Sequence, residues 1–113
     1  MDTAQAQQIA NTTLAQMGGR SFLALTGGSA SFDADGTLTV RLKNGSARKG
    51  INYVTITLDA NDTYSMTFGR VWIRKGNIGQ RQVAKHDGLY CDNIQDVFEA
   101  ETGLYVTLAP RVA

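Results

Sequence analysis

The sequence predicts a single α+β domain over residues 1–113, in which an N-terminal helix and a C-terminal helix lie on one face of an antiparallel meander of five to six strands. A chain of 113 residues has the size of one domain. Apolar residues recur every three or four positions near both ends of the chain and every second position between them. The spacing of a parallel βαβ unit is absent, so we expect antiparallel pairing throughout.

The two helices are predicted from their apolar spacing and from the residues that end them. The first is expected at about residues 3–17, where Asp2 or its neighbour can cap the N-terminus and Gly18-Gly19 supplies a left-handed end. The second is expected at about residues 88–102, where an aspartate near the start can act as a cap and Gly103 ends the helix.

The segment between the helices alternates between apolar and polar residues, as half-buried strands do. Clusters of Asp, Asn and Gly separate the alternating runs and are typical of turns, with a further turn expected at 76–79. A last edge strand is possible over 104–108. The main strands are expected at about residues 21–26, 30–33, 37–43, 51–58, 63–75 and 80–85.

The long strand at 63–75 changes phase along its length. Its first half places Tyr64 and Phe68 on the face that the helices cover, whereas Val71 in the second half falls on the opposite face. A β-bulge near Gly69 would bring all the apolar residues to one face. It would also place the cations and the tryptophan of the second half on the outer, solvated face.

Charge is distributed unevenly along the chain, although the net charge is only +1. Residues 41–85 hold nine cations and two acidic residues, whereas residues 86–113 hold one cation and five acidic residues. Cations neutralise phosphates, and exposed aromatic rings give bases a surface for stacking. We therefore predict a binding platform on the outer face of the sheet and its adjoining loop, made of Arg41, Lys43, Arg48, Lys49, Tyr53, Arg70, Trp72 and Arg74.

Catalysis is not expected. The string from Phe32 to Leu38 resembles the nucleophile loop of haloacid-dehalogenase-type phosphatases, but the parallel strand, the following helix and the later motifs of that family are missing. A hairpin turn explains the same residues. One histidine and one cysteine make a His-rich metal site or an internal disulfide impossible, and no cofactor motif is present. We predict no catalytic residue, no metal site and no cofactor.

Three segments resemble small uncharacterised proteins encoded by phages, prophages and conjugative plasmids. They are Gly50–Leu58, Asp62–Arg70 and Asp96–Tyr105. The resemblance covers roughly residues 20–108 and carries no assigned activity. It implies a mobile element in a bacterial cytosol as the genetic context. The absence of an apolar membrane span and of a signal peptide predicts a cytosolic protein with no membrane partner. Together with the resemblance, this gives the bacterial cytoplasm as the expected location.

Two classes of binding function, and a structural role, remain open from the sequence. The first is a protein that binds nucleic acid or a nucleoprotein complex through the basic and aromatic platform. The second is an anti-defence inhibitor of the anti-CRISPR kind, which would dock on a host immune complex with an acidic helix that imitates phosphate charge. The third is a virion or structural homo-oligomer, and a homodimer is possible in any of these classes. The acidic surface of the second class is Asp92, Asp96 and Glu99.

Overall fold

A computed structural model of the protein describes residues 2–43, 45–104 and 106. Helices lie at both ends of the described chain, and five strands and a short 3-10 helix lie between them. In chain order the elements are α1 (Thr3–Met17), α2 (Gly19–Thr26), β1 (Ser29–Phe32), β2 (Leu38–Arg41), η1 (Arg48–Gly50), β3 (Tyr53–Leu58), β4 (Tyr64–Arg74), β5 (Asn77–Leu89) and α3 (Ile94–Thr102).

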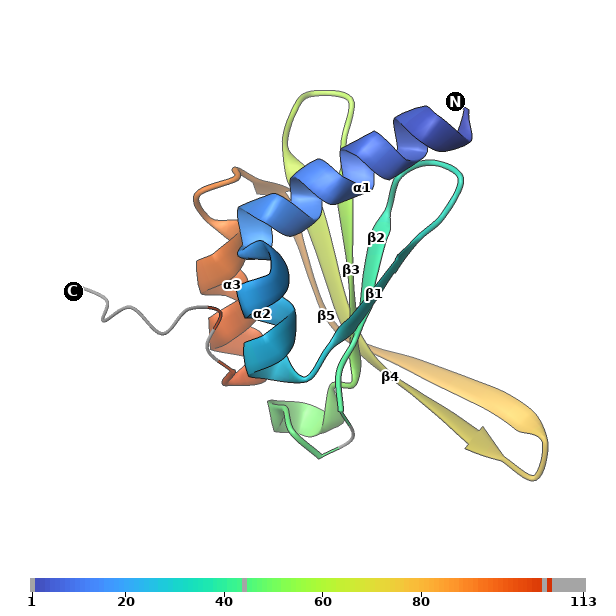
Figure 1. Cartoon of the computed structure of the whole chain (residues 1–113). Coiled ribbons are helices and arrows are strands. Elements are labelled where there is room, and N and C mark those ends of the chain that lie inside the picture. Colours follow the sequence, from blue (N-terminus) through green and yellow to red (C-terminus); the bar gives the residue numbers. More distant parts are fainter. Residues whose placement is uncertain (1, 44, 105, 107–113) are drawn as a thin grey trace.

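The strands form one antiparallel sheet in the order β1-β2-β3-β4-β5, which is the predicted meander. The helices gather on one face of this sheet (Figure 1). α1 contacts β1, β2 and β3, and α3 contacts β4 and η1. The predicted α+β class is therefore confirmed. The sheet has five strands, within the predicted five to six, and the helix α2 was not predicted.

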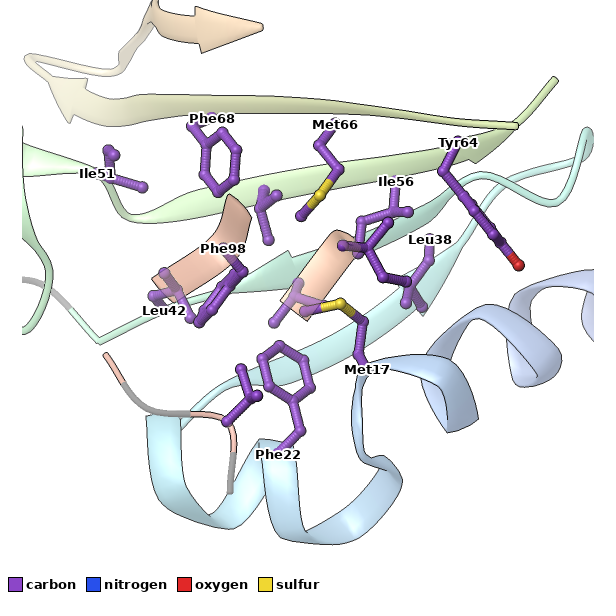
Figure 2. Close-up of a cluster of buried hydrophobic side chains, with 14 of the residues drawn as sticks. Met17, Phe22, Leu38, Leu42, Ile51, Ile56, Tyr64, Met66, Phe68 and Phe98 are labelled. Carbon is purple, nitrogen blue, oxygen red and sulfur yellow. The ribbon is translucent and has the colours of Figure 1, made fainter. Parts of the chain in front are cut away.

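The core lies between the helices and the inward side chains of the strands (Figure 2). Phe22 from α2 and Phe98 from α3 meet edge to face, with ring centroids 5.1 Å apart, and Phe68 of β4 lies 6.3 Å from Phe98. All three rings are fully buried. Burial of these rings and their apolar neighbours removes apolar surface from water, which is the main force that holds the helices on the sheet.

The first helix has the predicted bounds and the predicted caps. The side chain of Asp2 accepts a hydrogen bond from the backbone N–H of Gln5 at 2.8 Å, which satisfies one of the unpaired donors of the first turn. Gly18 ends the helix with φ of 118°, a left-handed conformation that glycine adopts without the penalty of a Cβ atom.

The segment predicted as a strand at 21–26 is instead the second helix, α2. Phe22 and Thr26 are four residues apart and both buried, and the Thr26 hydroxyl donates to the Phe22 carbonyl at 2.8 Å. An apolar run this short fits a helical or an extended period equally well, so tertiary packing decides. The strand prediction is wrong because the turn at Gly18 directs the chain straight into a second helix beneath the core.

Several other boundaries differ from the prediction. β5 begins at Asn77 and ends at Leu89, which pairs with Tyr64, so residues assigned to the first turn of the last helix belong to the sheet. α3 begins at Ile94, after Asn93 as its cap residue. The turn expected at 76–79 is the two-residue turn Lys75-Gly76. The edge strand expected at 104–108 falls mostly on residues outside the described ranges.

The irregularity predicted near Gly69 exists, but it lies on the neighbouring strand. Phe68 pairs with Ala84 and Gly69 with Gln82, so Val83 of β5 is the extra residue. β4 itself continues without interruption. Its side chains therefore keep alternating, and Arg70 and its even-numbered neighbours stay on the side that faces the helices. The predicted exchange of faces along β4 is wrong.

Candidate functional site

Beyond Gly69 the last two strands leave the body of the sheet as a two-stranded arm, residues 70–81. The pairing of β4 with β3 stops at the pair between Tyr53 and Gly69, so as strands the arm residues pair only with each other. The arm projects away from the helices and the other strands (Figure 1). Lys75 and Gly76 form its tip with φ of 51° and 81°. Two positive φ values are the mark of a type I′ turn, whose twist matches a tight hairpin.

One face of the arm combines cations with an indole ring. Arg70 pairs with Arg81 across the two strands, and Arg74 lies on the same side nearer the tip. A hollow of about 440 Å³ is lined by these residues and by Trp72 and Ile73. The arm carries four cations and no acidic residue. We call the set Arg70, Trp72, Arg74 and Arg81 the cationic face.

Trp72 is held in place by a glycine on the opposite strand. The indole lies directly over Gly79, where any Cβ atom would overlap the ring. The indole stays 39 % exposed. Arg70 is fixed from the other end, because its guanidinium donates to the carbonyl of Gly50 at 3.1 Å. The arrangement therefore presents an exposed indole between guanidinium groups, which suits a planar or anionic ligand.

The predicted platform does not form as one surface. Arg41 pairs with Tyr53, and Tyr53 pairs with Gly69, so Arg41 and Tyr53 lie on the open face of the sheet. Arg70 and Arg74 lie on the opposite side of β4. Tyr53 is 7 % exposed, and its hydroxyl accepts a hydrogen bond from Gln80 at 3.1 Å, so its ring is not a surface for stacking.

The side chains of β4 do not exchange faces beyond Gly69, and the reason is physical. Alternation reports which side chains face a core, and the arm has no core on either side. Val71 and Ile73 are apolar, but nothing in the fold requires them to face the helices. Lys43 is exposed just beyond the end of β2 and belongs to neither face of the arm.

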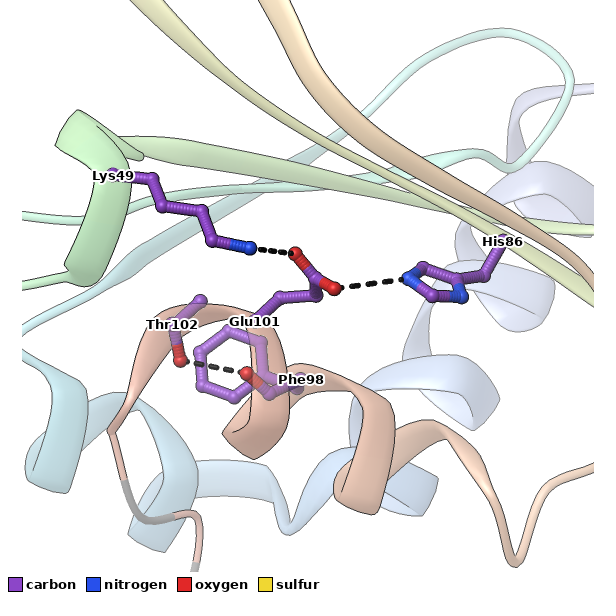
Figure 3. A network of polar contacts seen from close by, with 5 residues as sticks. All are labelled: Lys49, His86, Phe98, Glu101 and Thr102. Carbon is purple, nitrogen blue, oxygen red and sulfur yellow. Dashed lines mark hydrogen bonds and ion pairs between the residues drawn. The ribbon is translucent and has the colours of Figure 1, made fainter.

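Arg48 and Lys49 hold the C-terminal helix rather than a free surface. Lys49 donates to one carboxylate oxygen of Glu101 at 3.2 Å, and His86 of β5 contacts the other at 3.3 Å (Figure 3). The side chain of Arg48 lies against Gly103, where a Cβ atom would collide with it. These two predicted site residues thus connect η1 to α3.

Glu101 is the centre of that network and is ionised more readily than a free glutamate. Burial alone raises its pKa, but the hydrogen bonds and charges of Lys49 and His86 outweigh burial and hold the pKa below its ordinary value of 4.5. The Glu101 side chain is 17 % exposed. Its charge is therefore both shielded from water and matched by two neighbours.

The predicted acidic surface is only partly available to a partner. Asp92 and Asp96 are exposed at the start of α3. Glu99 instead accepts a hydrogen bond from the backbone N–H of Val106 at 2.9 Å, which holds the chain after the helix. Phosphate mimicry by all three residues therefore conflicts with the structural role of Glu99.

The string at Phe32–Leu38 forms the turn between β1 and β2. Asp33 Oδ1 accepts from the backbone N–H of Asp35 and of Thr37. The pKa of Asp33 is raised and that of Asp35 is lowered, chiefly because the two carboxyl groups share a hydrogen bond. These bonds serve the hairpin, and the strand before the turn is antiparallel to the strand after it.

Residues 2–43, 45–104 and 106 contain no group of three or more His, Cys, Asp and Glu side chains placed to hold a metal ion. In that same part of the chain, no helix combines the length and the apolar character needed to cross a bilayer. The two remaining candidates for chemistry are one cysteine and one histidine. The Cys91 side chain is exposed, and the His86 ring contacts the Glu101 carboxylate.

Sequence reasoning missed Arg81 as a site residue. The signal was the turn: once Lys75-Gly76 is recognised as a two-residue turn, the antiparallel register places Arg81 directly opposite Arg70. Prediction of a turn at 76–79 hid this pairing.

Comparison with known proteins adds no homologue to this description. No protein-family model, no curated protein and no solved structure matches the chain. The resemblance to proteins of mobile elements, the cytoplasmic location and the binding role of each site residue stay predictions.

Proposed function

We propose that the protein is a non-catalytic nucleic-acid-binding protein whose arm makes the contact. The observation that carries this proposal is the cationic face, where three arginines and a tryptophan share one side of a ribbon that stands clear of the body. No acidic residue of the arm opposes these cations, and within the described residues every ion pair involves groups outside the arm. Their charge is therefore available to phosphates.

The shape of the arm fits two forms of nucleic acid. A two-stranded β-ribbon is narrow enough to enter the major groove of a duplex, where arginine can also reach base edges. An exposed indole favours unpaired bases, because every base offers a ring face for stacking. Arg70 is tied to Gly50 and so fixes the base of the arm, while Arg74 and Arg81 are placed to follow a phosphate backbone.

The experiment measures the anisotropy of labelled single-stranded and duplex oligonucleotides as the protein is added, at low and at moderate salt. Arg74→Ala/Arg81→Ala removes two charges from the cationic face. Lys43→Ala/Lys85→Ala removes two exposed charges outside the arm and leaves the same net charge. We expect the arm variant to lose at least about tenfold in affinity with a shallower salt dependence, because each neutralised phosphate releases counterions.

The control variant is expected to bind within about threefold of the unmodified protein, because both of its charges lie outside the arm. Equal losses in both variants would show a diffuse charge effect and overturn the assignment to the arm. Absence of binding at low salt would overturn the proposal as a whole.

An anti-defence inhibitor that docks on a host immune complex stays the alternative. Asp92 and Asp96 are the exposed acidic groups that this alternative would use. It predicts tight binding to a purified immune complex that Asp92→Asn/Asp96→Asn weakens, without binding to bare DNA or RNA.

A further inference from the structure

The indole of Trp72 lies against the ribbon in one defined position. Trp72 pairs directly with Gly79, and a Cβ atom on Gly79 would overlap Cε2, Nε1 and Cζ2 of the indole at once. Directly paired residues of antiparallel strands share one side of the ribbon, so the ring takes the space of the missing side chain at 79. One side of the ring is therefore covered by the backbone of β5, and its exposed area is turned away from the ribbon.

Cations lie on both sides of this ring along the arm. Arg74 is two residues nearer the tip, and the pair of Arg70 and Arg81 is two residues nearer the body. The two cationic ends are thus four residues apart, a rise of about 13 Å along a strand. Arg74 and Arg81 are exposed, whereas the Arg70 guanidinium donates to the Gly50 carbonyl. Two exposed guanidinium groups therefore flank a flat apolar surface.

A base that is stacked within a duplex cannot cover this ring. The major groove presents only the edges of the bases, and insertion of the indole between two base pairs would require them to unstack. In a single strand, by contrast, each base can turn a ring face outward. Stacking of such a base on an aromatic side chain strengthens binding by about five- to 150-fold.

We infer that the ligand of the cationic face is single-stranded nucleic acid, with one unpaired base stacked on Trp72 and the neighbouring phosphates bound by Arg74 and Arg81. The inference rests on the proposed function and adds the selection of one form of nucleic acid. The hollow of about 440 Å³ that these three residues help to line receives the base. Gly79 is a specificity-determining residue, because its missing Cβ lets the ring lie against the ribbon.

The fluorescence of Trp72 reports stacking directly, since the chain has one tryptophan. One sequence is prepared as a single strand and as a duplex, in DNA and in RNA, and each form is titrated at low salt. We expect the single strand to quench the fluorescence and to bind at least about tenfold more tightly than the duplex.

Two variants test the ring and its position separately. Trp72→Leu removes the ring and keeps an apolar side chain, whereas Gly79→Ala keeps the ring but displaces it. Both should lose at least about fivefold in affinity for the single strand and stay within about twofold for the duplex, because the arginines are unchanged. Trp72→Phe should recover part of the loss. The matched control Tyr90→Leu removes an exposed ring outside the arm and should bind like the unmodified protein.

Duplex binding by the variants also checks that the arm is folded, since the paired strands hold Arg74 and Arg81 on one side. A duplex bound as tightly as the single strand, with no effect of Trp72→Leu, would overturn the inference and leave the proposed function standing. Equal losses for both forms in Trp72→Leu and Gly79→Ala would give the ring a structural role only, which also contradicts the inference. Absence of binding to either form would overturn the proposed function itself.

Discussion

Between Tyr64 and Phe68 every second side chain of β4 is buried beneath the helices, whereas between Arg70 and Arg74 none is. The first half pairs with strands on both sides, and the second half pairs with β5 alone. One strand thus passes from the body of the protein into the arm. The body contains the buried core, and the arm contains the exposed cations and the exposed tryptophan. Substitutions in the body should therefore change stability, and substitutions in the arm should change binding.

The largest expected effect is loss of a core ring. Phe98→Ala removes a fully buried ring that packs on Phe22 and Phe68, and it should cost about 3–5 kcal/mol in the free energy of unfolding. Ile73→Ala in the arm should change this free energy by less than about 0.5 kcal/mol. Urea denaturation measures both. Similar losses in the two variants would contradict the separation of body and arm.

The next effect concerns Gly69, where the body ends and the arm begins. A Cβ atom at this position would overlap the Tyr53 ring and the carbonyl of Arg81. Gly69→Ala should therefore destabilise the fold by about 1–3 kcal/mol, because the strands must move apart. Thermal unfolding measures the loss. Gly45→Ala does not serve as a control, because the positive φ at Gly45 would add backbone strain of its own. A variant as stable as the parent would show that the junction is loosely packed.

A smaller effect is expected from the network that joins α3 to the sheet. Glu101→Gln should cost about 1–2 kcal/mol, because it removes charge-assisted bonds to Lys49 and His86. Asp92→Asn, which neutralises an exposed carboxylate beside the same helix, should cost less than about 0.5 kcal/mol. Chemical denaturation at neutral pH compares the two variants, and equal costs would contradict the structural role of Glu101.

The same network predicts a pH dependence. The pKa of Glu101 in the folded chain is below the ordinary value of 4.5, so its ionised form stabilises the fold. That stabilisation is complete above the pKa of the unfolded chain and is lost as the pH falls through the lower folded pKa. Below pH 4.5 the unmodified protein should therefore lose stability more steeply than Glu101→Gln. Parallel curves for the two proteins would contradict the lowered pKa.

The smallest effect is expected at the tip of the arm. Lys75 holds a φ of 51°, which asparagine adopts more readily than lysine in a type I′ turn. Lys75→Asn should stabilise the hairpin by a few tenths of a kcal/mol, since the Asn-Gly turn is strongly preferred. Nuclear magnetic resonance of the arm amides can detect slower local opening. Faster opening than in the parent would contradict the turn geometry.

The sequence predicted those elements whose apolar side chains recur with the period of a helix or strand that packs against a core. The bounds of α1 and the antiparallel meander followed from apolar spacing and turn residues. The same reasoning mistook α2 for a strand, because a segment of six residues cannot distinguish the two periods without knowledge of what it packs against.

The candidate site could be predicted only in part. The basic and aromatic composition of 70–74 was visible in the sequence, but the face that each side chain takes was not. That assignment assumed a core beside Val71 and Ile73, and the arm has none. Lys49 shows the second difficulty, since a cation in a polar loop can serve a buried partner such as Glu101 that lies far along the chain.

Hydrogen exchange with and without oligonucleotide tests the central claim most directly, because it reports on body and arm in one measurement. At low protein concentration, peptides from 70–81 should exchange faster than those from β3. Added single-stranded or duplex oligonucleotide should slow exchange in 70–81. The exchange rate of β2, a strand of the body, should stay unchanged. Protection of β2 or α3 without protection of the arm would contradict the account.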